Sequence, residues 1–282
     1  MVIKRLLYIY LLVLVFTNCN AQQKEFKIFN ALLYKNTPNL KGYGFHEIFL
    51  FYEDDLNDLP NDLTTSSGRN INVNKVINSA RKAAINPNIP VCLDIESWPL
   101  DGDHKNKSKE KYKRVISLFK KHNSRSKLGY FGVYPMDSPH AEYSFNSEIR
   151  SSVIMPNWHK INNYFKDIGN SVDIFFPVFY TRFKDLETWE KIVKEKVNKI
   201  KEINPSGKIY GFIWPHYYTD NGKFPFIEKN IWQRQLEIVY KYCDGAVIWS
   251  HYNGPNGTPI NFSKNMGWFK ITLDFMEKNN IK

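Results

Sequence analysis

The chain has 282 residues, 43% of them hydrophobic and 16% aromatic, which is enough to build one sizeable core. Its formal net charge of +11 attracts polyanions at long range, so nucleic acid, acidic glycans and anionic lipid all qualify as partners. The few cysteines lie far apart in the sequence and cannot form a zinc site by themselves, and no other metal-ligand spacing is present.

Residues 1–21 are typical of an export signal. Lys4 and Arg5 form a charged start, and residues 6–16 form an apolar run too short to span a bilayer comfortably. Cleavage after Ala21 would leave residues 22–282 as the mature domain. The alternative is a lipid anchor at Cys19, although the residues before it make a poor lipobox. Because no other segment is long and apolar enough to be transmembrane, we expect a secreted, periplasmic or cell-surface protein.

Short apolar runs alternate with longer amphipathic ones along the rest of the chain. The candidate strands are 27–33, 47–52, 90–96, 128–134, 173–180, 208–214 and 245–251. Several are continuously apolar, as expected for parallel strands covered on both faces. The candidate helices are 73–84, 108–122, 158–168, 186–203, 228–242 and 263–278.

This alternation of strand and helix predicts a parallel α/β fold. Seven strands with helices between them suit a closed, TIM-like (β/α) barrel of seven or eight strands in a single domain. No glycine-rich dinucleotide or phosphate loop follows any strand, which weakens a Rossmann interpretation, and the sequence indicates no cofactor.

Two cysteines, Cys92 and Cys243, would remain after removal of the leader. In an exported protein they can form a disulfide. Each also lies in or beside a predicted buried strand, where a free cysteine acts as a small apolar side chain. The sequence leaves both possibilities open.

Barrel enzymes place their chemistry at the carboxyl ends of the strands. Asp94 and Glu96 lie two residues apart on the third predicted strand, so both side chains would point to one face, about 6–7 Å apart. Their repulsion would raise the pKa of at least one carboxyl group and keep a proton available near neutral pH. The alternative is a solvent-exposed strand end at which Asp94 caps the next helix. Trp98, just beyond, offers an indole face for stacking on a pyranose ring.

Four segments resemble the animal and venom hyaluronidases. Asp94-Ile95-Glu96-Ser97-Trp98 is similar to their Asp-x-Glu-x-Trp segment, and residues 129–135, which include Tyr134, are similar to their Gly-Tyr/Phe-Tyr-x-x-Pro strand. Pro-Val-Phe-Tyr at 177–180 resembles Pro-Ser-Ile-Tyr, and Gly-Ala-Val-Ile-Trp at 245–249 resembles Gly-Val-Val-Leu-Trp. The segments occur in the family's order, each at a predicted strand, and the resemblance covers roughly residues 26–278.

The resemblance implies retaining, substrate-assisted hydrolysis of a polysaccharide. Glu96 would protonate the leaving glycosidic oxygen, while the substrate's own acetamido oxygen attacks the anomeric carbon. Asp94 would hold the acetamido group, and Tyr180 would hydrogen-bond to its oxygen. Tyr218 and Trp249 would line the same subsite, and Trp98 and Tyr134 would contact the sugar chain.

The sequence also departs from the family. The animal enzymes follow the Trp with an Arg suited to a substrate carboxylate, whereas this chain has Pro99, and their disulfide framework is absent. The basic surplus still favours an anionic polymer such as hyaluronan or chondroitin. A chitinase-like hydrolase of neutral N-acetylglucosamine polymers and a barrel that only binds glycans remain as alternatives. Nucleic-acid binding is disfavoured because no basic-aromatic stripe is present.

Overall fold

The computed structural model describes residues 24–58, 68–136, 155–219, 223–254 and 257–282. The predicted leader at 1–21, with Cys19, lies outside these residues. Across the described part of the chain, no helix has the combination of length and hydropathy that crossing a bilayer requires.

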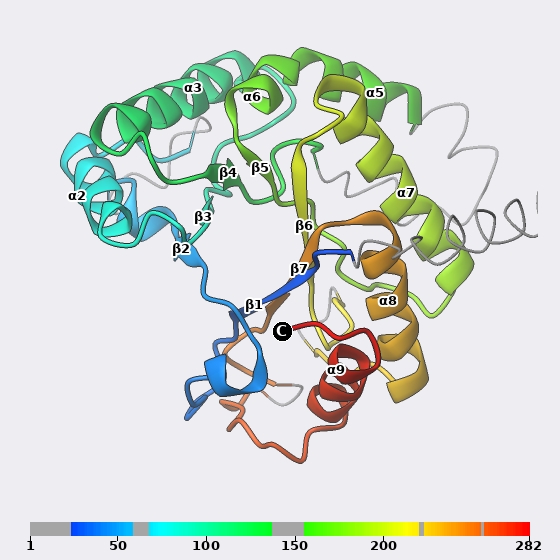
Figure 1. The fold of residues 1–282 in the computed structure, drawn as a ribbon. Helices are drawn as coiled ribbons and strands as arrows, with labels where there is room; N and C mark the ends of the chain where they lie inside the picture. Colours follow the sequence, from blue (N-terminus) through cyan, green and yellow to red (C-terminus); the bar gives the residue numbers. More distant parts are fainter. Residues whose placement is uncertain (1–23, 59–67, 137–154, 220–222, 255–256) are drawn as a thin grey trace, which may run out of the picture.

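Parallel strands form the centre of the molecule (Figure 1). They are β1 (Lys27–Ala31), β2 (Phe49–Phe51), β3 (Val91–Leu93), β4 (Leu128–Tyr130), β5 (Ile174–Phe175), β6 (Lys208–Ile213) and β7 (Gly245–Trp249). One sheet has the order β2-β3-β4 and the other the order β1-β7-β6-β5. Parallel bridges from Phe29 to His46 and from Phe131 to Phe176 join the two sheets at both edges. The described strands therefore close into a seven-stranded barrel, as the sequence predicts.

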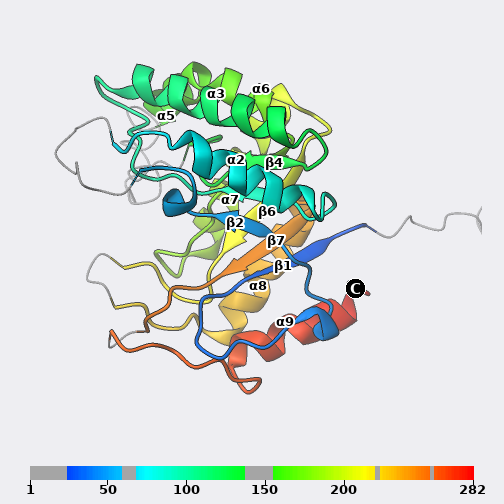
Figure 2. The same cartoon turned by 90° about the vertical axis from the view of Figure 1, so that its left-hand side faces the viewer.

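The helices surround this barrel in chain order, and Figure 2 shows them from the side, with α3 and α6 at the top and α9 at the bottom. They are α2 (Val73–Ala84), α3 (Lys105–His122), α5 (Met155–Tyr164), α6 (Lys166–Ser171), α7 (Leu186–Ile203), α8 (Lys229–Tyr242) and α9 (Gly267–Lys278). Two short 3-10 helices, η1 (Lys41–Tyr43) and η2 (Glu53–Asp55), lie on either side of β2. The predicted helix 158–168 is in fact divided between α5 and α6.

The helices begin and bury one face for local reasons. Asn72 caps α2 by accepting a hydrogen bond from the Lys75 amide, and Asp185 caps α7 by accepting bonds from two backbone amides of its first turn. In α2 the buried positions recur at helical spacing, at Val76, Ser79, Ala80 and Ala83. This pattern directs one apolar stripe of the helix against the barrel.

Side chains on the strands divide into two hydrophobic clusters. The inner cluster fills the barrel with every second residue, such as Phe29 of β1, Tyr210 and Phe212 of β6 and Val247 of β7. The outer cluster, which includes Ile28 and Ile248, lies between the barrel and the helices. Side chains therefore point alternately into the barrel and out toward the helices. A residue at the end of a strand reaches the barrel mouth when it lies an even number of residues from the inward-facing residues of that strand, which we call inward parity.

The two cysteines lie on opposite sides of the barrel wall. Cys92 belongs to the inner cluster and Cys243 to the outer one, and both are buried free thiols. Burial raises the pKa of both thiols well above the usual range, so both stay protonated. The structure thus answers the open question from the sequence in favour of apolar packing instead of a disulfide.

The strands are shorter than predicted at their carboxyl ends. The predicted strands 90–96, 128–134 and 173–180 end at Leu93, Tyr130 and Phe175. The ladder continues beyond them only as single contacts, such as the hydrogen bond from the Asp94 amide to the Phe51 carbonyl at 2.8 Å. The residues expected to carry the chemistry therefore lie mostly on irregular backbone above the barrel.

Candidate active site

An aromatic wall rises from the ends of β5, β6 and β7. Tyr180 is stacked on Trp249, with ring centroids 5.5 Å apart and 25° between the planes. Tyr180 is also stacked with Tyr218, with ring centroids 6.4 Å apart and 18° between the planes. The edge of Trp214 closes the group from β6, 5.6 Å from Tyr180. Tyr180 and Trp249 continue the inner cluster of the barrel, so both lie at its mouth.

Register explains why these rings point the same way. Thr181 is 1% exposed and accepts a hydrogen bond from Gln235 of α8, so it faces the helix layer. Tyr217 likewise donates a hydrogen bond to Glu228, beside the start of α8. Because neighbouring residues on extended backbone alternate in direction, Tyr180 and Tyr218 face the opposite side, toward the mouth. The sequence-predicted residues Tyr180, Tyr218 and Trp249 are therefore brought together.

The two predicted acids also lie together. Asp94 is 8% exposed and has the inward parity of Cys92, whereas Glu96 lies exposed above it. The two carboxyl groups share a side-chain hydrogen bond. Burial, the charge of Glu96 and the charge of Glu53 raise the pKa of Asp94 to about 8. The pair of carboxyl groups therefore retains one proton at neutral pH. Of the two residues, only Asp94 is buried.

The acid pair lies within electrostatic reach of the aromatic wall. The charges of Asp94 and Glu96 both act on Tyr180, whose pKa is raised well above its usual range, first by burial and then by these carboxylates. Tyr180 therefore remains a neutral phenol, which donates a hydrogen bond, over the whole physiological pH range. Asp94 Oδ1 is buried and has no hydrogen-bond partner within the described residues. Asp94 Oδ1 is thus a hydrogen-bond acceptor, and the Tyr180 hydroxyl a hydrogen-bond donor, at the barrel mouth.

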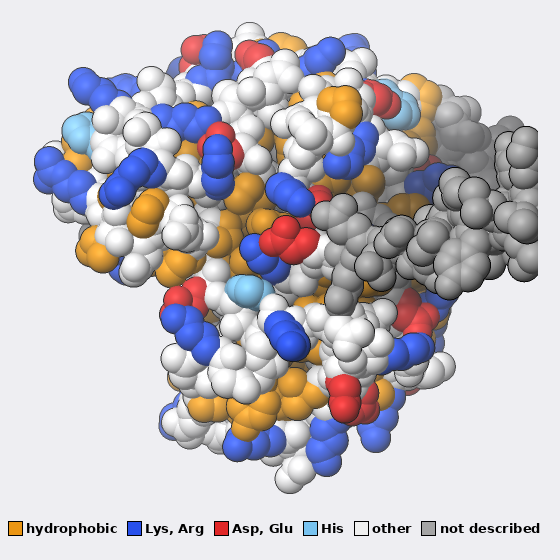
Figure 3. Space-filling model, viewed as in Figure 1, with side chains coloured by type: hydrophobic (Ala, Val, Ile, Leu, Met, Phe, Trp, Pro, Cys, Tyr) orange, Lys and Arg blue, Asp and Glu red, His pale blue; other side chains and the backbone are white. Residues whose placement is uncertain are grey.

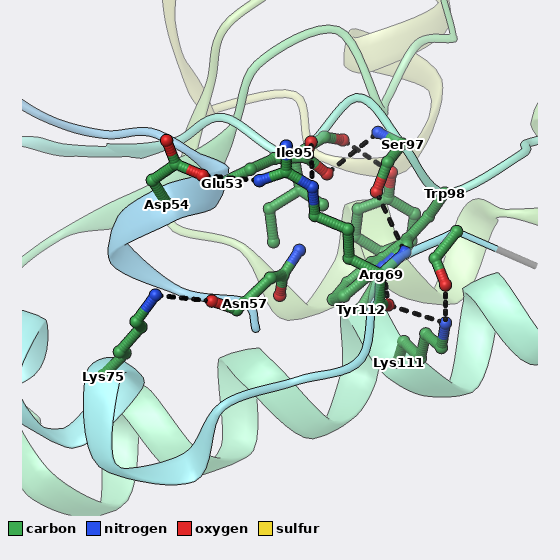
Figure 4. Close-up of polar contacts among 11 residues, drawn as sticks. Glu53, Asp54, Asn57, Arg69, Lys75, Ile95, Ser97, Trp98, Lys111 and Tyr112 are labelled. Carbon is green, nitrogen blue, oxygen red and sulfur yellow. Dashed lines mark hydrogen bonds and ion pairs between the residues drawn. The ribbon is translucent and has the colours of Figure 1, made fainter. Parts of the chain in front are cut away.

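Residues 52 and 53, at the end of β2, complete the site and are absent from the sequence-based prediction. The Tyr52 hydroxyl accepts a hydrogen bond from Trp249 Nε1 at 3.3 Å, and burial raises the pKa of Tyr52 to about 12. Glu53 accepts a hydrogen bond from the Ser97 amide at 2.9 Å (Figure 4). The sequence does contain a signal for these two residues. The predicted strand 47–52 ends at Tyr52, and acidic residues follow it directly at 53–55.

A cation adjoins the aromatic wall. The guanidinium of Arg182 lies over the ring of Tyr218, with Cζ 4.0 Å from the centroid. Arg182 follows Tyr180 by two residues, so it shares the mouth-facing direction. The sequence-based prediction did not include it, because the resembling segment at 177–180 ends two residues before Arg182.

Trp98 does not line the mouth, so the prediction that it stacks on a sugar is wrong. The side chain is 1% exposed and packs edge-on against Tyr112, 4.9 Å away. Its Nε1 donates a hydrogen bond to the Arg69 carbonyl at 2.7 Å. The chain bends after Glu96, which directs the indole into the outer cluster. No face of the ring remains for a ligand.

Tyr134 is likewise displaced from its predicted role as a sugar contact. It is 4% exposed and belongs to the outer cluster, where its ring lies 6.2 Å from Phe175. Its hydroxyl donates to the carbonyl of Lys199 in α7 at 3.4 Å. Tyr134 therefore joins the barrel to its helix layer.

No group of three or more His, Cys, Asp or Glu side chains in the described ranges has the arrangement of a metal site. His216, at the end of β6, is fully buried and hydrogen-bonded to the Tyr34 hydroxyl at 2.6 Å. Burial lowers the pKa of His216 to about 4, so it is a neutral core residue.

Comparison with known proteins agrees with this geometry. No protein-family model matches the chain. The salivary hyaluronidase of Lutzomyia longipalpis is 29% identical over 143 residues, which make up 47% of this chain and 35% of that protein. The match therefore spans only about a third of the length of this curated relative.

Two solved structures of bee venom hyaluronidase share the fold. One has a TM-score of 0.58 at 15% identity, covering 91% of this chain and 97% of the bee venom chain. The other, a complex with a hyaluronic acid tetramer, has a TM-score of 0.56 at 15% identity, covering 91% and 96% of the two chains. This chain is hyaluronidase-like in fold over nearly its whole length and in sequence over about half of it.

Proposed function

We propose that this protein is an exported glycoside hydrolase that cleaves β-N-acetylhexosaminidic bonds in a glycosaminoglycan such as hyaluronan or chondroitin. The observation that carries the proposal is the hydrogen-bonded pair Asp94–Glu96, whose charges act on Tyr180 in the aromatic wall that Tyr180 forms with Trp249. A retained proton and a sugar-sized aromatic surface are the two things that glycosidic bond cleavage needs from the enzyme.

Glu96 is the proton donor in this scheme because it is the exposed member of the pair. Asp94 lies below it and holds the shared proton at rest, since burial raises the pKa of Asp94 to about 8. A substrate amide N–H bonded to Asp94 Oδ1 favours the charged form of Asp94. The proton then passes along the existing hydrogen bond to Glu96 and on to the leaving glycosidic oxygen.

The attacking group belongs to the substrate. Its acetamido oxygen attacks the anomeric carbon and forms a cyclic intermediate, so the protein needs no nucleophile of its own. The Tyr180 phenol, kept neutral by burial, donates to the acetamido group and holds it in the attacking geometry. Trp249 and Tyr218 confine the sugar. Glu96 then acts as base and activates the water that opens the intermediate, which gives retention.

An anionic polymer is favoured over a neutral one by Arg182. Its guanidinium lies over Tyr218, next to the wall that would hold the sugar chain. A carboxylate or sulfate on a neighbouring sugar residue can accept a charge-assisted hydrogen bond from such a group, although Nε and Nη1 of Arg182 are buried. Pro99, which replaces the cation expected from the family resemblance, favours the second candidate, a hydrolase of neutral N-acetylglucosamine polymers.

Charged side chains outside the site give weaker support than Arg182 for specific recognition of an anionic polymer. On the face seen in Figure 3, Lys and Arg side chains are scattered over the surface with acidic side chains among them. This distribution gives general attraction to polyanions but no continuous basic track for one chain. Recognition is therefore assigned to the mouth, and export to the leader expected at residues 1–21.

The test is a reducing-end assay against hyaluronan, chondroitin and chitin oligosaccharides. We expect turnover of the anionic polymers, and loss of turnover in Glu96→Gln with its fold and glycan binding preserved. Glu110→Gln is the matched control, because Glu110 lies on α3 with its side chain 72% exposed. Full activity in Glu96→Gln removes this residue from its role, and binding without turnover in the unaltered protein favours a glycan-binding barrel.

A further inference from the structure

We infer that Glu53 is a positioning residue for the acid pair: its carboxylate anchors the peptide bond that follows Glu96 and supplies a fixed negative charge beside Asp94. This inference deepens the proposed function and rests on it. Glu53 would touch neither substrate nor reacting atoms. It would act through the two carboxyl groups that do.

The position of Glu53 comes from the turn after β2. Residue 53 is the first residue of η2, so it lies at the carboxyl end of a strand next to β3 in the barrel. Its side chain is 19% exposed. Oε1 accepts a hydrogen bond from the Ser97 amide at 2.9 Å. That amide belongs to the peptide bond whose carbonyl is that of Glu96, so the bond fixes the backbone where the proton donor is attached (Figure 4).

Arg69 holds the other side of the same loop. Its amide donates to Ser97 Oγ at 3.3 Å, and its carbonyl accepts from Trp98 Nε1 at 2.7 Å. Its Nε lies 3.8 Å from Glu53 Oε2, and its Nη1 donates to Asp54 Oδ1 at 2.5 Å. The loop after Glu96 is therefore held from two chain segments, one of them through the Glu53 carboxylate.

Gly68 permits this close approach. Its φ is +69°, and a Cβ at this position would lie 2.2 Å from the Ser97 carbonyl oxygen. Only glycine lets the 68–69 segment pack directly on the loop. The contact between Arg69 and residues 97–98 is thus built into the backbone.

The charge of Glu53 acts on the pair as well. The ionisable groups around Asp94 are Glu96, Glu53, Tyr52, Cys92, Tyr112 and Tyr180. Burial raises the pKa of the tyrosines and of Cys92, so these four groups stay neutral near pH 7. Among the described residues, Glu53 is therefore the carboxylate outside the pair whose charge adds to the effect of burial in retaining the shared proton, with Arg69 balancing part of its charge.

Three variants separate the two roles. Glu53→Gln keeps an oxygen that accepts from the Ser97 amide but removes the charge, and Glu53→Ala removes both. Asp54→Asn is the matched control, because Asp54 shares the ion pair with Arg69 and the same 3-10 helix but is 71% exposed and makes no bond to the loop. The fold of each variant is checked by circular dichroism and thermal unfolding.

Removal of the charge makes it easier for the pair to lose its last proton, and the positive charge of Arg69, which among the described residues then keeps only its ion pair with Asp54, acts in the same direction. In Glu53→Gln we expect the basic limb of the kcat profile to move down by about one pH unit, with KM unchanged. Glu53→Ala should show the same shift and a further fall in kcat of about tenfold, because the proton donor loses its anchor. Asp54→Asn should leave the limb in place.

A second readout does not depend on turnover. The ¹³C-carboxyl resonance of Asp94 in the free protein should titrate at lower pH in Glu53→Gln than in the unaltered protein. An unchanged midpoint in an active enzyme overturns the charge role, and equal kcat in Glu53→Ala and Glu53→Gln overturns the anchor role. If the midpoint moves while no glycan is cleaved by any form, the proposed function fails and the electrostatic role of Glu53 stands.

Discussion

The ring of Tyr180 lies 25° from parallel to the indole of Trp249, with centroids 5.5 Å apart. The two residues come from the ends of β5 and β7, which are separated by β6, and Trp214 at the end of β6 lies edge-on to both at 5.6 Å and 5.1 Å. A narrow seven-stranded barrel brings the ends of non-adjacent strands this close. The stack is thus set by the barrel, and the hydroxyl of Tyr180 is left for chemistry.

Tyr180→Phe is expected to lower kcat about 100-fold, because it removes the hydrogen bond that holds the acetamido group in the attacking geometry while the stack remains. Stability should change little. The measurement is kcat and KM on the cleaved polymer together with the thermal midpoint. Tyr130→Phe is the matched control, since it removes a buried hydroxyl that donates to the Tyr112 carbonyl away from the mouth. Equal activity of both variants would exclude the assigned role of Tyr180.

Much of this arrangement follows from the sequence. Continuous apolar strands alternating with amphipathic helices predict the barrel, and the strand ends predict that Asp94, Tyr180 and Trp249 lie together. The position of Tyr134 does not follow in this way. β4 ends at Tyr130 and Gly132 has a φ of +63°, so strand alternation does not extend to Tyr134, and its burial beneath α7 comes from tertiary packing.

Other features depend on tertiary contacts that no local pattern encodes. Trp98 would share the direction of Asp94 if the strand continued, but β3 ends at Leu93 and the chain bends, so parity is lost. Glu53 reaches the loop after Glu96 only because β2 and β3 are neighbours. Such contacts between distant chain segments can be identified only in the folded barrel.

Asp94→Asn is expected to stabilise the protein at alkaline pH. The folded state keeps Asp94 protonated up to about pH 8, whereas the unfolded chain loses that proton near 3.8, so this group lowers stability as pH rises between the two values. The variant should gain about 1–3 kcal/mol in unfolding free energy at pH 8 relative to pH 4. Urea unfolding of both proteins at several pH values measures this. A constant difference across the range would contradict the raised pKa.

Cys92 and Cys243 are expected to react with Ellman's reagent only after unfolding. Both thiols are buried, and burial keeps them protonated. In a Cys19→Ser background, native protein should show no rapid thiol reaction, and denatured protein should release two equivalents without a reductant. Two equivalents that appear only after reduction would reveal a disulfide and contradict the separation by the barrel wall.

Arg182→Gln is expected to reduce discrimination between charged and neutral forms of one substrate. If the guanidinium over Tyr218 receives a substrate carboxylate, hyaluronan oligosaccharides should be preferred to their methyl esters, and the variant should lose about tenfold of that preference. Arg234→Gln is the control, because it removes one positive charge from the exposed side of α8, where the side chain is 50% exposed. The ratio of kcat/KM for the two substrates is the measured quantity, since general attraction would lower this ratio equally in both variants. A ratio that falls only in Arg182→Gln assigns carboxylate recognition to the aromatic wall, and equal ratios in both variants assign it to the general surface charge.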